Sequence, residues 1–195
     1  MNYYLFMVIS FIIGSVPVGL LIANAKGVDI RKVGSGNIGA TNILRSVGKK
    51  EALATLLGDM AKGLIPVLIA RELYPDSLKV GLVGIAAIVG HDFSIFLKLK
   101  GGKGVATSLG VILAYSPLVA LITIVVWISV FIISRISSLS ALIAFILLPA
   151  NTYLIDNAEG KFLISLMVCL LIIVKHKDNI MRLLRGEESR VGQNA

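Results

Sequence analysis

Long apolar segments alternate with short polar stretches along most of the chain. The apolar runs cover residues 3–25, 52–70, 78–97, 105–134, 136–155 and 162–174. Crossing about 30 Å of hydrocarbon takes roughly 20 residues of helix, so most of these runs have about the length of a membrane span. The run 105–134 is too long for one span, and Pro117 is a natural break within it. We therefore divide it into a short helix at 105–115 and a full span at 117–134.

Basic residues decide how often the chain crosses the membrane. They gather in the loop 26–50, in the loop 98–103 and in the tail after residue 174. Basic loops stay on the cytoplasmic side, and these three share a side only if the run 105–134 crosses twice. The pattern predicts an all-α integral membrane protein with seven transmembrane helices, with the N-terminus outside and the C-terminus cytoplasmic.

One of the seven predicted helices is a half-helix. At 1.5 Å per residue, the helix 105–115 is only about 17 Å long, too short to cross alone. We therefore expect it to line a cavity or to be buried in protein.

The composition agrees with a membrane location. Of the 195 residues, 56% are hydrophobic and 15% are charged, whereas soluble domains have about 25% charged residues. We predict a single polytopic domain, 1–195, in the cell inner (cytoplasmic) membrane. On a soluble protein the net charge of +8 would suggest a nucleic-acid partner. On a membrane protein it indicates basic loops, anionic lipid or an anionic substrate, so we expect no nucleic acid.

The first polar loop contains a glycine motif, "VGSGNIGATN", at residues 33–42. Its glycines have the spacing of a dinucleotide-binding fingerprint, but that motif needs a preceding strand, and an apolar helix precedes this one. We therefore exclude a dinucleotide-binding domain. Glycines still let backbone N–H groups approach an anion closely, and successive N–H groups can form an anion-binding nest. The loop is a candidate anion site, with a flexible solvated loop as the alternative.

Polar side chains strengthen this candidate. Hydroxyl and amide groups come from Ser35, Asn37, Thr41 and Asn42. Arg45 supplies a fork of donors suited to phosphate. We also expect Thr41 or Asn42 to cap a short helix that ends near Gly48.

A second candidate site follows at residues 90–108, "GHDFSIFLKLKGGKGVATS". Lysines at 98, 100 and 103 flank a glycine run that leads into the predicted half-helix, and helix N-termini bind anions. Contact with lipid headgroups would explain the lysines but not Gly101, Gly102 and Gly104. His91 could be a general base, a phosphate donor or a structural hydrogen-bonding group. Asp92 is adjacent to it and so points elsewhere on a helix.

Two further features leave alternatives open. "VKHKDNIMRLLRGEE" follows the last span, and an amphipathic membrane anchor explains its basic residues but does not require His176 or Asn179. Asp59 and Lys62 share a helix face within a span. They form either a functional site or a mutually neutralising structural pair. The two histidines and one cysteine show no ligand spacing, so we expect no metal and no cofactor.

Together, "GSGNIGATN", "GHDFSIFLKLKGGKGVATS" and "KHKDNIMRL" resemble the signature motifs of the PlsY family of bacterial membrane acyltransferases. The resemblance spans nearly the whole chain and includes a D-x-x-K-G element at Asp59, Lys62 and Gly63. Two positions depart from the family pattern. Ser94 stands where the family usually has proline, a change that could alter a helix kink, and Lys177 stands where it often has arginine.

The resemblance implies transfer of a fatty acyl group from acyl phosphate to the 1-hydroxyl of glycerol 3-phosphate. The products are lysophosphatidic acid and phosphate, in the first step of phospholipid synthesis. It implies that glycerol 3-phosphate is surrounded by Ser35, Arg45, Lys103, His176 and Asn179. It places nearer the acyl phosphate Gly36, Thr41, Gly101 and Gly102. The predicted catalytic residues are Ser35, His91 and Lys103. The predicted substrate-binding set also contains Asn37, Asn42, Lys62, Gly104 and Thr107.

No covalent intermediate is required, because the acyl carbonyl is already activated. The base for the acceptor proton is His91, His176 or an oxygen of the acyl phosphate, and we favour the last. We expect a monomer whose active site faces the cytoplasm. The alternatives are a transporter of phosphate or an organic anion and a non-enzymatic binder of anionic lipid. A transporter does not predict that the anion-binding groups gather at one membrane face.

Overall fold

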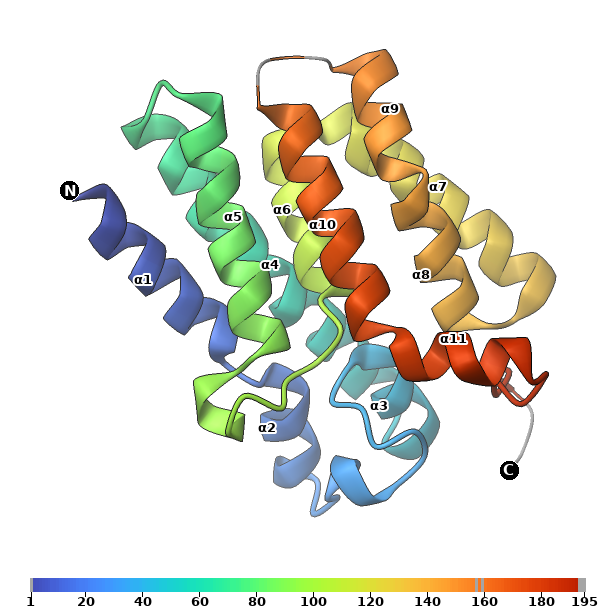
Figure 1. Ribbon diagram of the computed structural model, residues 1–195. Helices are drawn as coiled ribbons and strands as arrows, with labels where there is room; N and C mark the ends of the chain where they lie inside the picture. Colours follow the sequence, from blue (N-terminus) through green and yellow to red (C-terminus); the bar gives the residue numbers. More distant parts are fainter. Residues whose placement is uncertain (1, 157, 159, 193–195) are drawn as a thin grey trace.

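The computed structural model describes residues 2–156, 158 and 160–192, which form a bundle of helices (Figure 1). The helices are α1 (Tyr3–Ser15), α2 (Val18–Ala25), α3 (Ala40–Ser46), α4 (Lys49–Leu73), α5 (Ser77–Asp92), α6 (Val105–Tyr115), α7 (Pro117–Ser134), α8 (Ser137–Ile146), α9 (Leu148–Ile155), α10 (Lys161–Lys175) and α11 (Lys177–Leu184), with short 3-10 turns η1 (Ile30–Lys32) and η2 (Ile95–Leu97). The predicted all-α class is confirmed.

Five helical segments within the described residues are long and apolar enough to cross a membrane. They are Tyr3–Ala25, Lys49–Leu73, Ser77–Leu97, Pro117–Ser134 and Ser137–Ile155. The shorter apolar helix α6 has the predicted bounds of the half-helix. The remaining helices are α10, which is 15 residues long, the short helix α3, and the short polar helix α11, which crosses the end of α10 in Figure 1.

Two of the predicted spans are broken helices. The first changes direction at Pro17, which has no N–H to continue the hydrogen bonding of α1. The span 137–155 is interrupted at Leu147, just before the proline in the first turn of α9. In the third span the α-helix ends at Asp92, and the chain continues through the turn η2.

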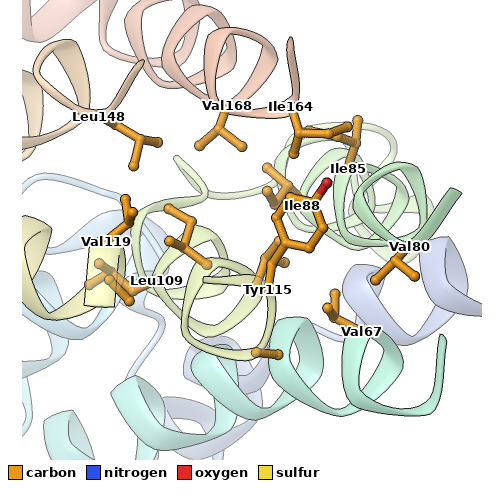
Figure 2. Packing of buried hydrophobic residues seen from close by; sticks show 14 of the residues in the cluster. Val67, Val80, Ile85, Ile88, Leu109, Tyr115, Val119, Leu148, Ile164 and Val168 are labelled. Carbon is orange, nitrogen blue, oxygen red and sulfur yellow. The ribbon is translucent and has the colours of Figure 1, made fainter. Parts of the chain in front are cut away.

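Helix α6 lies at the centre of the core. Most of its side chains are buried, as expected for a half-helix held within protein. Figure 2 shows Leu109 and Tyr115 of α6 among side chains from the surrounding helices, including Val67 of α4, Ile88 of α5 and Val168 of α10. The short helix is thus enclosed by longer ones.

Close backbone contacts between helices depend on glycine. A Cβ atom at Gly63 or Gly110 would lie 2.3 Å or 2.0 Å from a carbonyl oxygen of the facing helix, where α4 packs against α6. Gly14 and Gly90 allow the same approach between α1 and α5, where a Cβ would lie 2.1 Å from the opposite carbonyl oxygen in both cases. Small residues at such interfaces are typical of membrane helices, because they let the backbones pack closely.

Buried side chains satisfy the carbonyl groups that the break in the first span leaves open. Lys62 donates to the oxygen of Val16 at 2.9 Å, and the Ser94 hydroxyl donates to the oxygen of Ser15 at 2.6 Å. Lys62 also forms an ion pair of 2.9 Å with Asp59, so the pair contributes to the structure at this break. Ser94 follows the end of α5, and its departure from the usual proline therefore introduces no kink within that helix.

Candidate active site

A cavity of about 340 Å³ lies between the chain before α3, the loop before α6 and helix α11. These segments meet at one end of the bundle (Figure 1). The cavity is lined by Arg31, Ser35, Gly36, Asn37, Ile38, Lys100, Gly101, Lys103, Asp178, Asn179 and Arg182. Four cationic side chains and one carboxylate make it an electropositive site. The structure thus brings six predicted residues into one cavity: Ser35, Gly36, Asn37, Gly101, Lys103 and Asn179.

The first glycine loop wraps around the side chain of Asn42. The Asn42 Oδ1 atom accepts from the N–H of Ser35 at 3.0 Å. Its Nδ2 atom donates to the carbonyl oxygens of Ile30, Val33 and Asn37 at 3.2, 3.1 and 2.9 Å. Gly34 and Gly36 have φ values of +56° and +69°, a conformation that glycine adopts without strain. Asn42 therefore shapes the loop from beneath it.

The prediction that Thr41 or Asn42 caps the short helix is wrong. Helix α3 begins earlier than that, at Ala40, and its N-cap is Gly39, which has no side chain to form a capping bond. Asn42 lies within the helix, and its amide is committed to the loop. The Thr41 hydroxyl instead forms a hydrogen bond of 3.0 Å with Ser137, beside the start of α8.

Several N–H groups of the glycine loops are already paired within the protein. Gly101 and Gly102 donate to the carbonyl oxygens of Asp92 and His91 at 3.2 and 3.0 Å. Gly36 donates to the Val33 oxygen at 3.0 Å, at the other side of the cavity. In this state, side chains rather than these N–H groups supply the positive potential of the cavity.

Lys103 is the most enclosed cation of the cavity. Its ammonium group donates to Asn179 Oδ1 of helix α11. Burial lowers its pKa to about 8, and the negative charge of Glu188 opposes this shift. Near neutral pH the side chain is therefore mostly protonated and able to attract a phosphate.

His176 is buried beside this lysine but does not line the cavity. Its Nδ1 atom lies 2.8 Å from the oxygen of Ile172, so a neutral ring would carry its proton on Nδ1. Burial, and next the charge of Lys103, lower the pKa of His176 to about 4. The imidazole is therefore neutral at physiological pH and is a weak base.

Other predicted residues lie behind the second glycine loop. His91 is 4% exposed, and a Cβ at Gly102 would lie 2.1 Å from its Nε2 atom. Its Nδ1 atom is 3.7 Å from a carboxylate oxygen of Asp59. Gly104 starts α6 with a φ of +74°, and Thr107 is buried in the first turn of that helix. The structure places none of these residues, nor Lys62, in the lining of the cavity, and their predicted roles stay predictions.

The chain after α11 folds back beside the cavity. Arg45 of α3 donates to the hydroxyl and carbonyl oxygens of Ser189 at 2.8 and 3.2 Å, and it does not line the cavity in this state. The Glu188 carboxylate accepts from Ser138, Asn179 and Arg182 at 2.7, 2.5 and 2.7 Å. The segment thus holds side chains that the sequence had suggested for phosphate binding.

The sequence-based site omitted five lining residues: Arg31, Ile38, Lys100, Asp178 and Arg182. Arg182 had a usable signal, because it lies three residues after Asn179 and so shares its helix face. Lys100 was one of three lysines in its motif, and nothing in the sequence distinguishes it from Lys98. Across 2–156, 158 and 160–192, no group of three or more His, Cys, Asp or Glu side chains could hold a metal ion.

Comparison with known proteins gives concordant matches over almost the whole chain. Residues 4–186 match the family model described as glycerol-3-phosphate acyltransferase. The protein of that name from Geobacter sulfurreducens is 45% identical over 97% of this chain and 98% of its own length. The one from Bartonella quintana is 49% identical over 94% of this chain and 89% of its own length.

Two solved structures share the fold. A crystal structure of the integral membrane glycerol 3-phosphate acyltransferase PlsY, in its glycerol 3-phosphate form, has a TM-score of 0.94 and 40% identity. The match covers 97% of this chain and 96% of that one. The lysophosphatidic acid form of PlsY has a TM-score of 0.92 and 39% identity, with coverage of 97% and 95%.

Proposed function

Because the chain belongs to the glycerol-3-phosphate acyltransferase family, we propose that its cationic cavity is the active site of acyl transfer. The enzyme transfers a fatty acyl group from acyl phosphate to glycerol 3-phosphate, giving lysophosphatidic acid and phosphate. The family match favours this reaction over transport of an anion.

The observation that carries the site assignment is the meeting of three distant segments around one electropositive cavity. The loop 33–39, the loop 98–104 and helix α11 each contribute to its lining. The reaction must hold two phosphorylated molecules together against their mutual repulsion. Clustered lysine and arginine side chains offset that repulsion, because arginine and lysine both bind phosphate well.

Ser35, Lys103 and Asn179 are proposed to bind glycerol 3-phosphate, since all three line the cavity. Arg45 and His176 are proposed to complete this set in the substrate complex. Gly36, Gly101, Gly102 and Thr41 are proposed to lie nearer the acyl phosphate, with the acyl chain between helices and open to lipid.

In the proposed reaction, the 1-hydroxyl oxygen of glycerol 3-phosphate attacks the acyl carbonyl carbon. The bond between that carbon and the phosphate oxygen breaks, and phosphate leaves. We propose that the hydroxyl proton passes to an oxygen of the departing phosphate. A neutral His176 with a pKa of about 4 is a poor acceptor, and His91 does not line the cavity. Positioning and electrostatic stabilisation then supply most of the catalysis.

For the membrane arrangement we propose seven crossing elements: α1 with α2, α4, α5, α6, α7, α8 with α9, and α10. The N-terminus is outside, and the C-terminus and the cavity face the cytoplasm from the inner membrane. The basic loops at the cavity end support this orientation. We further propose one domain that acts as a monomer, without metal or cofactor, on substrates that include acyl phosphate.

The test is an assay of purified protein with acyl phosphate and labelled glycerol 3-phosphate. Lys103→Ala and Ser35→Ala should each lower kcat/KM by about 100-fold or more, comparable to losing a charge-assisted contact in a closed site. Lys50→Ala, at an exposed position in the first turn of α4, is the control and should retain the rate. Near-normal rates for both cavity variants would refute the site assignment.

A further inference from the structure

The segment 187–191 is held against the cavity end of the bundle. The Glu187 N–H donates to the Arg182 oxygen at 2.8 Å, and the Val191 N–H donates to the Arg135 oxygen at 2.8 Å. Between these two anchors, the side chain of Glu188 is 8% exposed. A nearly buried carboxylate next to a proposed phosphate site is unexpected, because its negative charge repels the substrate. Its presence therefore suggests that the charge has another role in the site.

A chain of hydrogen bonds joins Glu188 to the cavity. Its Oε1 atom accepts from Asn179 Nδ2 at 2.5 Å, and the other atom of that amide, Oδ1, accepts from the ammonium group of Lys103. Ser138 and Arg182 complete the coordination of the carboxylate at 2.7 Å each. One anion thus organises three donors from two helices, α8 and α11, and two of these donors, Asn179 and Arg182, also line the cavity.

These partners fix the orientation of the Asn179 amide. A lysine ammonium only donates hydrogen bonds, and a carboxylate only accepts them. The amide can satisfy both neighbours in one orientation, with its oxygen toward Lys103 and its nitrogen toward Glu188. In the reverse orientation, two donors would face each other at one end and two acceptors at the other.

We propose that Glu188 is a positioning residue of the active site, which sets the Asn179 amide and through it the Lys103 ammonium for substrate binding. This inference rests on the proposed site and adds a residue that touches neither substrate.

The charges around Lys103 support the same conclusion. Burial is the main cause that lowers its pKa to about 8, and Glu188 is the largest opposing charge. Arg182 and Arg45 act in the same direction as burial, whereas Asp178 acts with Glu188. His176 also lies near Lys103 but is neutral at the pH of the assay. Without the charge of Glu188, the pKa of Lys103 falls below about 8, and a larger share of the lysine is uncharged at neutral pH.

The main experiment compares Glu188→Gln with Glu187→Gln. Both variants remove one negative charge from neighbouring positions, but Glu187 is exposed and Glu188 is nearly buried. Glutamine offers one accepting oxygen to three donors. We expect Glu188→Gln to raise KM for glycerol 3-phosphate about tenfold or more, in line with losing a charge-assisted hydrogen bond. Glu187→Gln should match the unaltered protein.

The pH profile provides a readout that a merely structural role would not change. The second pKa of a phosphate is about 6, so the substrate governs the acid limb of kcat/KM. The alkaline limb reports deprotonation of Lys103 in our proposal. Glu188→Gln should shift this limb to lower pH, after correction for spontaneous hydrolysis of acyl phosphate. An unmoved limb together with an unchanged KM would overturn the proposal.

Glu188→Asp separates the effect of the charge from the effect of side-chain length. It also provides a second test if the glutamine variant fails to fold. The shorter carboxylate keeps the charge near Lys103 but cannot contact all three donors at once. We expect KM to rise severalfold with the alkaline limb in place, and an unchanged KM would count against the positioning role. A lower KM in either variant would instead identify Glu188 as an anion that competes with substrate, which would also refute the proposal.

A double-mutant cycle tests whether Glu188 acts through Asn179. In an Asn179→Ala background, at a pH well below the alkaline limb where Lys103 is charged in every variant, Glu188→Gln should cause little further rise in KM, because the amide it orients is gone. Fully additive effects would contradict the proposed path. Failure of the site assignment itself gives a different result: Lys103→Ala and Ser35→Ala would then retain activity, whatever Glu188 variants do.

Discussion

At the scale of single residues, Asn42 shows how a side chain can serve a site from outside it. It lies at a position where the sequence suggested either substrate binding or capping. The structure uses its one acceptor and two donors to hold the backbone of the loop 30–37. The positions of Ser35 and Asn37 in the cavity therefore depend on an amide that is only 3% exposed.

Asn42→Asp should damage both stability and activity. The new carboxylate would face the carbonyl oxygens that Nδ2 now contacts, and a buried unpaired group of this kind costs about 3 kcal/mol. We expect a lower midpoint of thermal unfolding and a strongly reduced acyl-transfer rate. Asn24→Asp, the same change at an exposed asparagine, is the control. Equal behaviour of the two variants would show that Asn42 does not organise the loop.

The sequence pointed to residues that do line the cavity where the residue type indicates anion binding, although their roles stay predictions. Lys103 and Ser35 stood in a glycine loop with a clear anion-binding pattern, and both line the cavity. Arg31 had no such signal, because its place depends on how η1 turns the chain. Gly101 and Gly102 had a clear signal for anion binding, but their N–H groups pair with carbonyl oxygens at the end of α5. The spacing of residues in the sequence does not reveal this contact.

At the scale of helices, a close backbone contact links the buried helix α6 to α4. Gly63 and Gly110 face the opposite backbone across this interface. Gly63 also follows Lys62, which bonds to the break in the first span. The α4–α6 contact thus fixes both the half-helix and the buried Asp59–Lys62 pair, directly behind the second glycine loop.

Gly63→Ala should destabilise the protein. The added Cβ would lie 2.3 Å from a backbone oxygen, so the helices must separate, and such overpacking typically costs about 1–3 kcal/mol. The measurement is thermal unfolding in detergent, with Leu57→Ala on the lipid-exposed side of α4 as the control. Leu57 is 56% exposed, so its truncation should change the unfolding midpoint little. A stable Gly63→Ala protein would show that this interface can relax.

The helix boundaries were predictable where one residue ends a helix by its own geometry. Pro117 placed the start of α7, and the glycine run placed the start of α6 at residue 105. The break at Pro17 was not anticipated, although proline was its cause, because the run 3–25 has the length of a single span and so gave no reason to divide it. A hydrophobic pattern reports the length of an apolar segment, and that length is compatible with a continuous or a broken helix.

At the scale of the whole molecule, the two ends of the bundle differ in the size of their cavities and in the charged residues that line them. The cavity and its cationic side chains lie at the end that carries α3 and α11. The opposite end holds a smaller cavity of about 250 Å³, lined in part by Arg71, Tyr115 and Lys161. Lys161 there pairs with Asp156 at 2.6 Å, which neutralises part of its charge.

The proposed orientation can be tested with introduced cysteines. The native Cys169 is buried, so the unaltered chain should react little with a membrane-impermeant maleimide. We expect Glu72→Cys to be labelled in intact cells and Lys50→Cys only after permeabilisation, because these exposed positions lie at opposite ends of α4. The reverse pattern would invert the topology and place the active site outside.

The folded-back segment 187–191 has a consequence for the making of this protein. Arg45 and Ser189 meet across 144 positions of sequence, and every proposed spanning element except the first, α1 with α2, lies between them. During translation the helices can enter the bilayer one after another, while the partners of Arg45 and Asn179 are still unsynthesised. If Arg45 and Asn179 bind substrate as proposed, the site can be completed only after the stretch behind α11 has left the ribosome.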